Sequence, residues 1–503
     1  MGVKVETQAG RALGIRDGEL CVFRGIPYAK PPVGPLRFRA PEPAEPWSGV
    51  RDASAFGPAA PQAPVGLDGI PGMEVGEQSE DCLTLNVFTP AADAGRRPVM
   101  VWIHGGAFIN GSSSQRMYDF RKLAARGELV IVSINYRLGA LGFLHLAGLD
   151  AGLGTTSNAA LLDQIAALGW VRDNIAAFGG DPQRVTIFGE SAGGMSVGAL
   201  LGTPAARGLF HGAIAQSGAA NRVMDAEAGT RVVCTLLDEL GIEPGELARL
   251  WELPAESLVE AQGRCAQRLN AAVGMRFFGP VVDGATLREP PLEAIRGGLS
   301  RAVPVLVGAT RDEEKLFGLM DPKAWSLDEA GLLRRVEKRV GTAARGLIEA
   351  YRKAREGNRS TEPPELYFAI ETDRGYRMPA VRLAEAQSLH QPKTFAYLVT
   401  WESPLRDGTL GACHGIDVPF VLGSIGRKGA NLFTGGGPAA ERLSEQMMDA
   451  WIAFARGGDP NHPGLPDWPS HEASRRATML LGRDCEVADA PLESEREAWQ
   501  GIL

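Results

Sequence analysis

The sequence has few cysteines, no cluster of basic residues and no long apolar run. Its six cysteines are scattered over 503 residues, with none in a Cys-x-x-Cys pair or beside histidines at zinc spacing. This pattern is typical of reduced thiols and indicates no metal site. The formal net charge of −8 argues against nucleic acid or an anionic membrane as a partner. The most apolar stretches, such as 129–134, have the length of strands rather than of membrane helices.

Several signals of cofactors and of targeting are also missing. The sequence contains neither a His-Glu-x-x-His motif nor a Walker-type loop, so we expect no metal and no organic cofactor. Residues 1–7 show no basic head followed by an apolar stretch, which predicts a cytoplasmic protein. We expect a monomer or a weak homo-oligomer.

Strand-like and helix-like runs alternate through most of the chain, and this alternation predicts an α/β fold. A mostly parallel central sheet with helices on both faces is the expected architecture. Residues 1–50 are rich in glycine, proline and short apolar pieces, which favours an antiparallel edge, and the clearest helices are expected at 160–177 and 439–456. The clearest strands are Pro98–His104, Leu129–Tyr136, Arg184–Gly189, Gly212–Gln216, Val303–Gly308 and Thr394–Thr400.

Two helix-rich regions, about 224–272 and 325–390, interrupt the rhythm of strands. We interpret them as insertions over the carboxyl edge of the sheet, where they could wall a cleft. Helices that only cover the sheet would explain either region equally well. No linker-like segment divides the chain, so residues 1–503 are expected to form a single catalytic domain.

Residues 189–193 read Gly-Glu-Ser-Ala-Gly, directly after the β-branched and aromatic run Val185–Phe188. A strand, a sharp turn with a serine between two glycines and then a helix form the nucleophile elbow of α/β-hydrolases. Strain in such a turn holds the hydroxyl of Ser191 in a cleft. With 63 glycines in the chain, an ordinary glycine-rich turn would explain the motif alone. The rest of a hydrolase site must therefore be found in the right order.

A base and an acid are needed beside the serine, and in this fold they follow it in the order acid, then histidine. His414 lies in a loop of small residues after the strand 394–400, where the sheet edge of the elbow is expected. The other histidines after Ser191 stand at a strand start, a helix end or in a proline-rich segment: His211, His390, His462 and His471.

The acid is expected at the end of the strand 303–308. Asp312, Glu313 and Glu314 follow that strand, and their spacing alone leaves all three as candidates. Any two of these three carboxylates would be explained equally well as solvent-exposed residues of an acidic turn.

A glycine-rich loop after an earlier strand should supply the oxyanion donors. Residues 104–107 read His-Gly-Gly-Ala and match the HGGG type of lipase and esterase loop, with Ala107 in the third glycine position. Because the donors are backbone N–H groups, alanine still supplies one. The N–H of Ala192, after the serine, is the further donor.

These residues and their surroundings resemble the type B carboxylesterase family, which includes the cholinesterases. The resemblance is closest to its bacterial para-nitrobenzyl esterase group, which also has alanine at position 107. It covers nearly the whole chain and implies a serine carboxylesterase that acts on a small ester through an acyl-enzyme on Ser191. The matching segments are 25–29, 41–43, 80–87, 135–137, 178–182, 189–193 and 458–461.

The resemblance also assigns roles that spacing left open. It implies Glu313 as the acid and Gly106, Ala107 and Ala192 as oxyanion donors. It places Glu190 and Ser217 near the histidine. Structural ion pairs are implied between Arg37 and Glu80 and between Arg137 and Asp163.

Two departures from the family bear on function. The family usually has glycine where this chain has Glu314. The segment 56–81 contains no tryptophan or tyrosine, whereas cholinesterases bind choline through a tryptophan of this loop. Choline esters are therefore not expected to be preferred. A non-catalytic binding protein, a lipase for long acyl chains and a hydrolase of amides or carbamates are the alternative functions.

Overall fold

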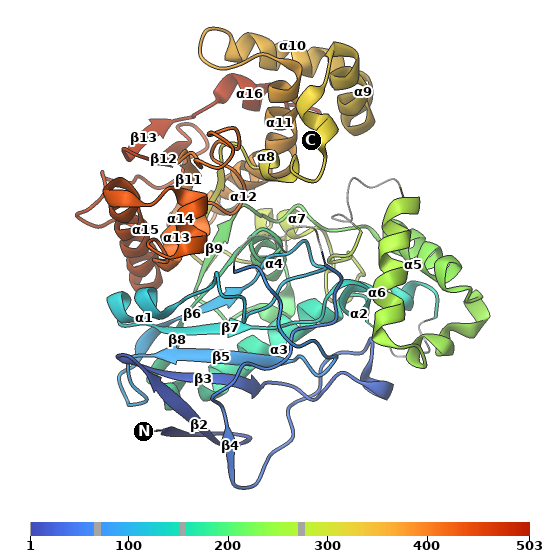
Figure 1. Cartoon of the computed structure of the whole chain (residues 1–503), viewed down its shortest axis with the longest axis vertical. Helices are drawn as coiled ribbons and strands as arrows, with labels where there is room; N and C mark the ends of the chain where they lie inside the picture. Colours follow the sequence, from blue (N-terminus) through green and yellow to red (C-terminus); the bar gives the residue numbers. More distant parts are fainter. Residues whose placement is uncertain (1, 65–71, 151, 153–155, 270–276) are drawn as a thin grey trace.

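The computed structural model describes residues 2–64, 72–150, 152, 156–269 and 277–503. Its centre is a 13-stranded sheet with the order β1-β2-β3-β5-β7-β6-β8-β9-β10-β11-β12-β13, and β4 pairs with β2 (Figure 1). The strands are β1 (Val3–Thr7), β2 (Gly10–Asp17), β3 (Leu20–Pro27), β4 (Val50–Asp52), β5 (Thr84–Thr89), β6 (Arg97–Ile103), β7 (Val130–Ile134), β8 (Gly180–Glu190), β9 (Gly212–Gln216), β10 (Val305–Thr310), β11 (Thr394–Val399), β12 (Ala477–Leu481) and β13 (Glu486–Asp489).

Every neighbouring pair from β7 to β12 in this order is parallel. At one end of the sheet β1, β2, β3 and β5 pair antiparallel with their neighbours in this order, and β13 does so at the other end, whereas β4 is parallel to β2. The predicted α/β-hydrolase architecture and its antiparallel N-terminal edge are therefore confirmed. The parallel strands are almost wholly buried because helices cover both of their faces.

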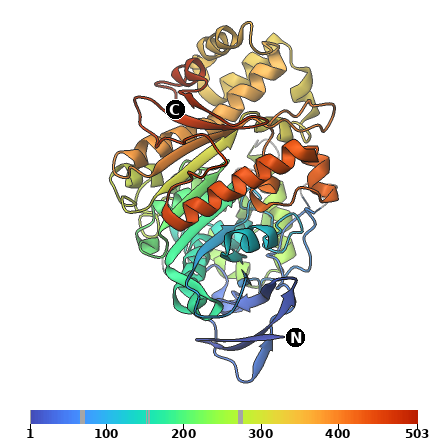
Figure 2. The ribbon, with the colours of Figure 1, turned by 90° about the vertical axis from the view of Figure 1, so that its left-hand side faces the viewer.

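Alternate side chains of each central strand enter two different cores. In β6, Val99 and Val101 face one core, whereas Met100 and Trp102 face the other. The second face is covered by α1 (Arg121–Gly127), α13 (Asp417–Leu422) and α15 (Gly437–Gly457), and α15 runs across this face in Figure 2. The first face is covered by α2 (Gly139–Phe143), α3 (Ala159–Asn174), α4 (Ala192–Leu201), α5 (Ala226–Leu240), α6 (Ala255–Arg268), α7 (Pro291–Arg296) and α12 (Met378–Ser388).

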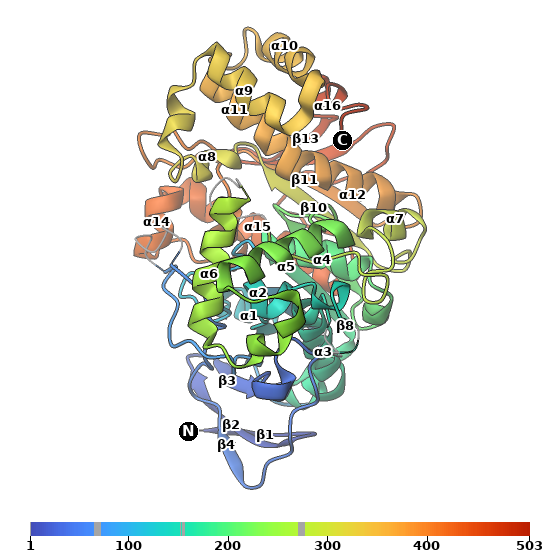
Figure 3. The ribbon, with the colours of Figure 1, turned by 90° about the vertical axis from the view of Figure 1, so that its right-hand side faces the viewer.

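The two helix-rich regions differ in what they cover. The first holds α5 and α6, which pack into the first core in front of α2 (Figure 3); its last three residues, 270–272, lie outside the described part. In the second region α12 covers the sheet. The helices α9 (Glu329–Val340), α10 (Ala344–Arg355) and α11 (Pro363–Thr372) instead build a separate small core with α16 (Glu493–Glu497) alongside, at the top of Figure 1.

The loops that carry the candidate site leave the carboxyl ends of parallel strands. β8 ends at Glu190 and β10 ends at Thr310, and the loop after β11 leads towards α13. In parallel sheets the carboxyl ends lie on one edge, where crevices for ligands form. Two short helices border this edge, α8 (Glu314–Phe317) and α14 (Lys428–Thr434).

Candidate active site

Ser191 occupies a strained turn between β8 and α4. Its backbone has φ 59° and ψ −124°, a conformation that costs a non-glycine residue on the order of 1–3 kcal/mol. A Cβ on Gly193 would lie 2.0 Å from the carbonyl oxygen of Ile103, and one on Gly189 would lie 2.6 Å from the same atom. The two glycines therefore let the turn pack against β6. The N–H of Ser191 also donates to the carbonyl of Gln216 at 2.9 Å, which fixes the turn to β9.

A buried carboxylate holds the ring of His414. Glu313 is 0% exposed, and its Oε2 lies 2.5 Å from Nδ1 of His414, although the two residues are 101 positions apart. The other oxygen of Glu313 accepts a hydrogen bond of 2.6 Å from the N–H of Thr310 at the end of β10. Both oxygens of the carboxylate are therefore engaged, and the imidazole is orientated by a rigid group.

The two neighbouring acids point elsewhere. Burial acts to raise the pKa of Asp312, but the adjacent guanidinium of Arg311, 2.8 Å away, together with Lys315 and the N–H of Ala412 outweighs burial and lowers it. Asp312 also accepts the N–H of Ala412. Glu314 begins α8 with its N–H donated to Thr372, and its φ is not positive, so the helix start does not require a glycine there. Of the three candidate acids, Glu313 is the one in contact with His414.

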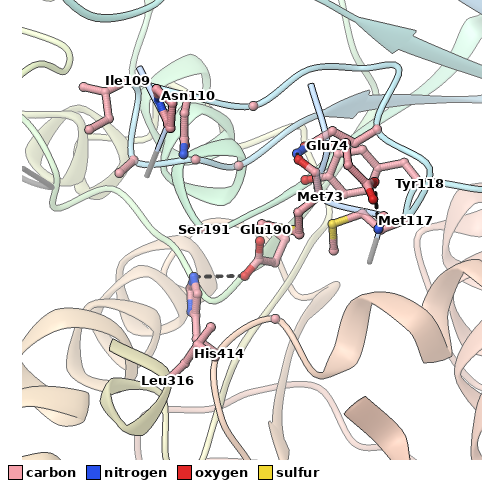
Figure 4. Close-up of a pocket in the computed structure, with 18 of the residues that line it drawn as sticks. Met73, Glu74, Ile109, Asn110, Met117, Tyr118, Glu190, Ser191, Leu316 and His414 are labelled. Carbon is pink, nitrogen blue, oxygen red and sulfur yellow. Dashed lines mark hydrogen bonds and ion pairs between the residues drawn. The ribbon is translucent and has the colours of Figure 1, made fainter. Parts of the chain in front are cut away.

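The second nitrogen of His414 faces Glu190. Nε2 lies 3.1 Å from Oε1 of Glu190, and Figure 4 shows the two side chains pointing toward each other. No hydrogen bond joins Nε2 to the hydroxyl of Ser191 among the residues that the structure describes. The rings of Phe317 and Tyr376 each lie with their centroids 5.0 Å from the imidazole and wall it in.

Burial and charge act in opposite directions on this pair. Burial lowers the pKa of His414, but Glu190 and Glu313 outweigh it and raise the pKa to about 9. Burial raises the pKa of Glu190 to about 8, against the attraction of His414. The site therefore favours the imidazolium form of the histidine strongly.

The loop 104–108 crosses the elbow with an unusual backbone. Gly106 has φ 108°, and a Cβ there would lie 2.1 Å from the carbonyl oxygen of Asn110. Ala107 and Phe108 have φ values of 55° and 65°, in the left-handed region where side chains are strained. In the described part of the chain, the N–H groups of Gly106 and Ala107 donate to no other protein group. The N–H of Ala192 begins α4, so it has no acceptor within its helix.

The structure adds a buried acid that the sequence reasoning missed. Asp417 is 0% exposed, and burial raises its pKa to about 6. Its Oδ2 accepts a 2.8 Å hydrogen bond from Gln216, which in turn accepts from the indole of Trp451. A polar residue three positions after His414, at the start of a helix, was the available signal. The hydroxyl of Ser217 is buried and has no hydrogen-bond partner within the described residues, so it makes no hydrogen bond to His414.

Ser191 lies between two cavities. The larger, of about 640 Å³, is also lined by Glu190 and His414, and the smaller is about 250 Å³. The larger is mostly apolar. Its lining residues include Met73, Ile109, Met117 and Leu316, which Figure 4 labels, and also Phe317, Met320 and Phe433. The smaller is lined by Phe108, Met195, Met224, Phe278 and Pro280 together with Asn221 and Arg222.

Both ion pairs implied by the resemblance are formed. Arg37 donates from Nε to Glu80 at 2.8 Å, and Arg137 pairs with Asp163 at 2.6 Å, fully buried. Among the described residues, no group of histidine, cysteine, aspartate or glutamate has the arrangement of a metal site. No described helix has the length and apolar character required to cross a bilayer.

The strand order and the turn at Ser191 define an α/β-hydrolase. The chain belongs to the carboxylesterase family, whose model matches residues 2–499. It is 40% identical to the para-nitrobenzyl esterase of Bacillus subtilis, over 98% of this chain and 97% of the other. It is 39% identical to the phenmedipham hydrolase of Pseudarthrobacter oxydans, over 96% of each. The crystal structure of a Geobacillus stearothermophilus carboxylesterase, EST55, matches with a TM-score of 0.89 and 41% identity, over 99% of this chain and 100% of that one. The protein is therefore a serine carboxylesterase, a hydrolase of carboxylic esters.

Proposed function

We propose that Ser191 is the nucleophile of this esterase, with His414 as its base and Glu313 as the acid that orients the base. The contact of 2.5 Å between Nδ1 of His414 and the buried carboxylate of Glu313 carries this proposal. A neutral imidazole held in this way carries its proton on Nδ1 and leaves Nε2 as an acceptor. Nε2 then faces the cavity that Ser191 also lines.

The reaction follows from these positions. Oγ of Ser191 attacks the ester carbonyl while Nε2 of His414 takes its proton. The imidazolium then protonates the leaving alcohol, and an acyl-enzyme remains on the serine. Water activated by His414 releases the carboxylic acid and restores the hydroxyl. Neither a metal nor an organic cofactor takes part in these steps.

The N–H groups of Gly106, Ala107 and Ala192 are the proposed oxyanion donors. The free donors on the glycine loop and at the start of α4 support this role, because each lies beside Ser191 in the fold. Ala107 also has a left-handed backbone, a conformation that non-glycine residues hold mainly at functional sites. The loss of one such donor costs about 3–4 kcal/mol of transition-state stabilisation.

Glu190 and Ser217 are the proposed polar neighbours of His414. At 3.1 Å from Nε2, Glu190 stabilises the imidazolium that exists while the tetrahedral intermediate lasts. The same contact competes with Ser191 for Nε2 in the resting enzyme. Ser217 follows β9, and its N–H is bound to the carbonyl of Gly308 on β10, which sets it beside the loop of the acid.

The chemistry assigns the two halves of an ester to the two cavities. His414 must protonate the leaving alcohol, and it lines the larger cavity and not the smaller one. The alcohol therefore occupies the larger, apolar cavity, and the acyl group extends into the smaller one. Bulky or aryl alcohols joined to short acyl groups are the expected substrates.

The domain organisation, oligomeric state and cellular setting of the whole chain are also part of the proposal. Residues 1–503 act as one catalytic domain, with the helical regions as its excursions, and the protein works as a monomer or weak homo-oligomer. Its partner is a small ester, not nucleic acid or a membrane. The six unpaired thiols support a reducing, cytoplasmic setting.

Replacement of Ser191 by alanine tests the mechanism. We expect kcat for para-nitrophenyl butyrate to fall by roughly 10⁶-fold while the circular dichroism spectrum stays unchanged. A fluorophosphonate probe should label the wild type and not the variant. Near-normal turnover by the variant would exclude this serine as the nucleophile. A series of para-nitrophenyl esters of increasing acyl length, with a matching anilide, defines the acyl range and separates ester from amide hydrolysis.

A further inference from the structure

The imidazole of His414 contacts one aromatic ring from each of the two cavities beside Ser191. Phe317 lines the larger cavity and Tyr376 lines the smaller one. The centroid of each ring lies 5.0 Å from that of the imidazole. Of these two cavities, His414 itself lines only the larger. The ring of Tyr376, a residue that is 3% exposed, therefore packs between the imidazole and the smaller cavity.

The orientation of this imidazole decides whether His414 acts as a base. Glu313 fixes the ring only at Nδ1, and Nε2 faces Glu190 at a distance of 3.1 Å. To take the proton of Ser191, Nε2 has to face the hydroxyl instead. A hydrogen bond at one nitrogen leaves the ring free to turn about that nitrogen, so the groups packed against the ring set its orientation. A misplacement of about 1 Å at such a centre lowers a rate by up to about 100-fold.

Tyr376 belongs to a rare backbone element. Asp373–Arg377 form a π-helical turn between α11 and α12 (Figure 3), and such turns are frequent at functional sites. The helix α11 packs into the small core with α9 and α10, whereas α12 packs into the first core against the sheet. This π-turn therefore joins the two cores, and it presents Tyr376 to the site from outside the loops that carry the proposed catalytic groups.

The ends of the π-turn are held by a buried polar cluster. The carboxylate of Asp373 accepts two hydrogen bonds of 2.5 Å from the guanidinium of Arg377. Asp373 also accepts from the hydroxyl of Tyr351 on α10, and that hydroxyl accepts a 2.6 Å hydrogen bond from the indole N–H of Trp499. All four side chains are buried. Because a buried charge left without its partner is costly, the turn cannot shift without breaking favourable contacts. The small core therefore fixes the position of Tyr376.

We propose that Tyr376 is a positioning residue: its ring, fixed by the small core through the π-turn, keeps the imidazole of His414 where Nε2 reaches the hydroxyl of Ser191. The proposal rests on the proposed function, because it takes His414 as the base. It assigns the small core of α9, α10, α11 and α16 a part in catalysis.

The first test replaces Tyr376 by leucine and by phenylalanine. Para-nitrophenyl acetate and para-nitrophenyl hexanoate are the substrates, and complete titration with a fluorophosphonate probe counts the folded active sites. Without the aromatic ring, Tyr376→Leu should lower kcat about tenfold for both esters, with KM changed by less than about threefold. Tyr376→Phe keeps the ring and should keep kcat within about threefold of the wild-type value. A residue that only walls the acyl cavity would change the preference between the two esters. A loss confined to one ester, or wild-type kcat in Tyr376→Leu, would therefore overturn the proposal.

The second test is a double-mutant cycle with the anchor of the π-turn. Tyr351→Phe removes the hydroxyl that joins Trp499 to Asp373 and leaves Tyr376 in place. It should lower kcat about threefold in the wild-type background and no further in Tyr376→Leu, because both changes act on the same contact. Additive losses, or wild-type kcat in Tyr351→Phe alone, would show that the small core does not position the ring.

The matched control is Tyr367→Phe, on the same small core. The ring of Tyr367 packs on Phe368 and lies 5.1 Å from the guanidinium of Arg335, so its hydroxyl should not affect kcat. A loss equal to that of Tyr351→Phe would indicate a general effect of the helical region and would also overturn the proposal. Failure of the proposed function has a different signature, because His414→Ala would then still cleave both esters. Failure of the positioning role alone leaves His414→Ala inactive.

Discussion

The contact between Glu190 and His414 should set the pH dependence of the enzyme. Nε2 and Oε1 are 3.1 Å apart, and at an effective dielectric constant of 20 two full charges at this distance attract by about 5 kcal/mol. That figure is an upper limit, because burial raises the pKa of Glu190 to about 8 and the carboxyl is therefore mostly protonated near neutral pH. One pH unit corresponds to about 1.4 kcal/mol, so even a quarter of this attraction moves a pKa by about one unit.

The sign follows from the role of the histidine. His414 must be neutral to accept the proton of Ser191, and the carboxylates hold its pKa at about 9 in spite of burial. The rate should therefore rise with pH through that value. In Glu190→Gln the midpoint of this rise in kcat/KM should move toward the ordinary value of 6.5 by about one pH unit or more. The plateau at high pH should fall, because the imidazolium of the transition state loses its partner.

The assay is kcat/KM for para-nitrophenyl butyrate between about pH 5 and pH 10, corrected for spontaneous hydrolysis. Glu74→Gln serves as the matched control, because Glu74 lines the same cavity but does not contact the imidazole. Its midpoint should stay at the wild-type value. A midpoint in Glu190→Gln that is unchanged, or that moves to higher pH, would refute the electrostatic argument.

Three further predictions follow from the scaffold and from the cavity. In Gly193→Ala the new Cβ would lie 2.0 Å from the carbonyl of Ile103, so we expect a loss of roughly 1–3 kcal/mol in urea unfolding together with most of the activity; wild-type values for both would contradict the packing. Asp163→Asn leaves Arg137 buried without its counter-ion and should cost about 3–5 kcal/mol, whereas Asp173→Asn, in an exposed pair, should cost less than about 1 kcal/mol; equal losses would be evidence against the role of burial. Butyrylcholine should give a lower kcat/KM than an uncharged butyrate ester, and the reverse order would show that another group binds the ammonium.

The central sheet was predictable because its strands are short, apolar and bounded by breakers. The strand 212–216 was predicted with its observed bounds, and the other central strands agree to within a few residues. The elbow was predictable for a related reason. Its glycines are required because a Cβ on Gly193 would lie only 2.0 Å from the carbonyl oxygen of Ile103 in β6. The residue types of the motif therefore indicate the close packing of the turn.

The contacts between distant loops were not predictable from spacing alone. The spacing of the sequence does not distinguish Asp312, Glu313 and Glu314. In the structure their contacts differ, because the chain after β10 turns only Glu313 toward His414. Asp417 was missed because its place at the start of a helix, three positions after His414, does not reveal that its carboxylate is buried. The contact of Nε2 of His414 with Glu190 was also not predictable, because it depends on how deeply both side chains are buried, and no sequence motif indicates this.

Four of the twelve non-glycine residues with positive φ in the described part of the chain lie where the proposed chemistry is. Ala107, Phe108, Ser191 and Ser217 all have positive φ without being glycine, and all lie at the carboxyl edge of the central strands. Each such residue costs on the order of 1–3 kcal/mol, so the four together approach the net stability of a typical domain. Such a backbone persists only where the surroundings over-determine it. Here the buried strands and the N–H of Ser191 bound to β9 supply that constraint. The rigid sheet therefore holds the proposed oxyanion donors and Ser191 in a conformation that is unfavourable in isolation. A more relaxed loop would have to be ordered again in each catalytic cycle.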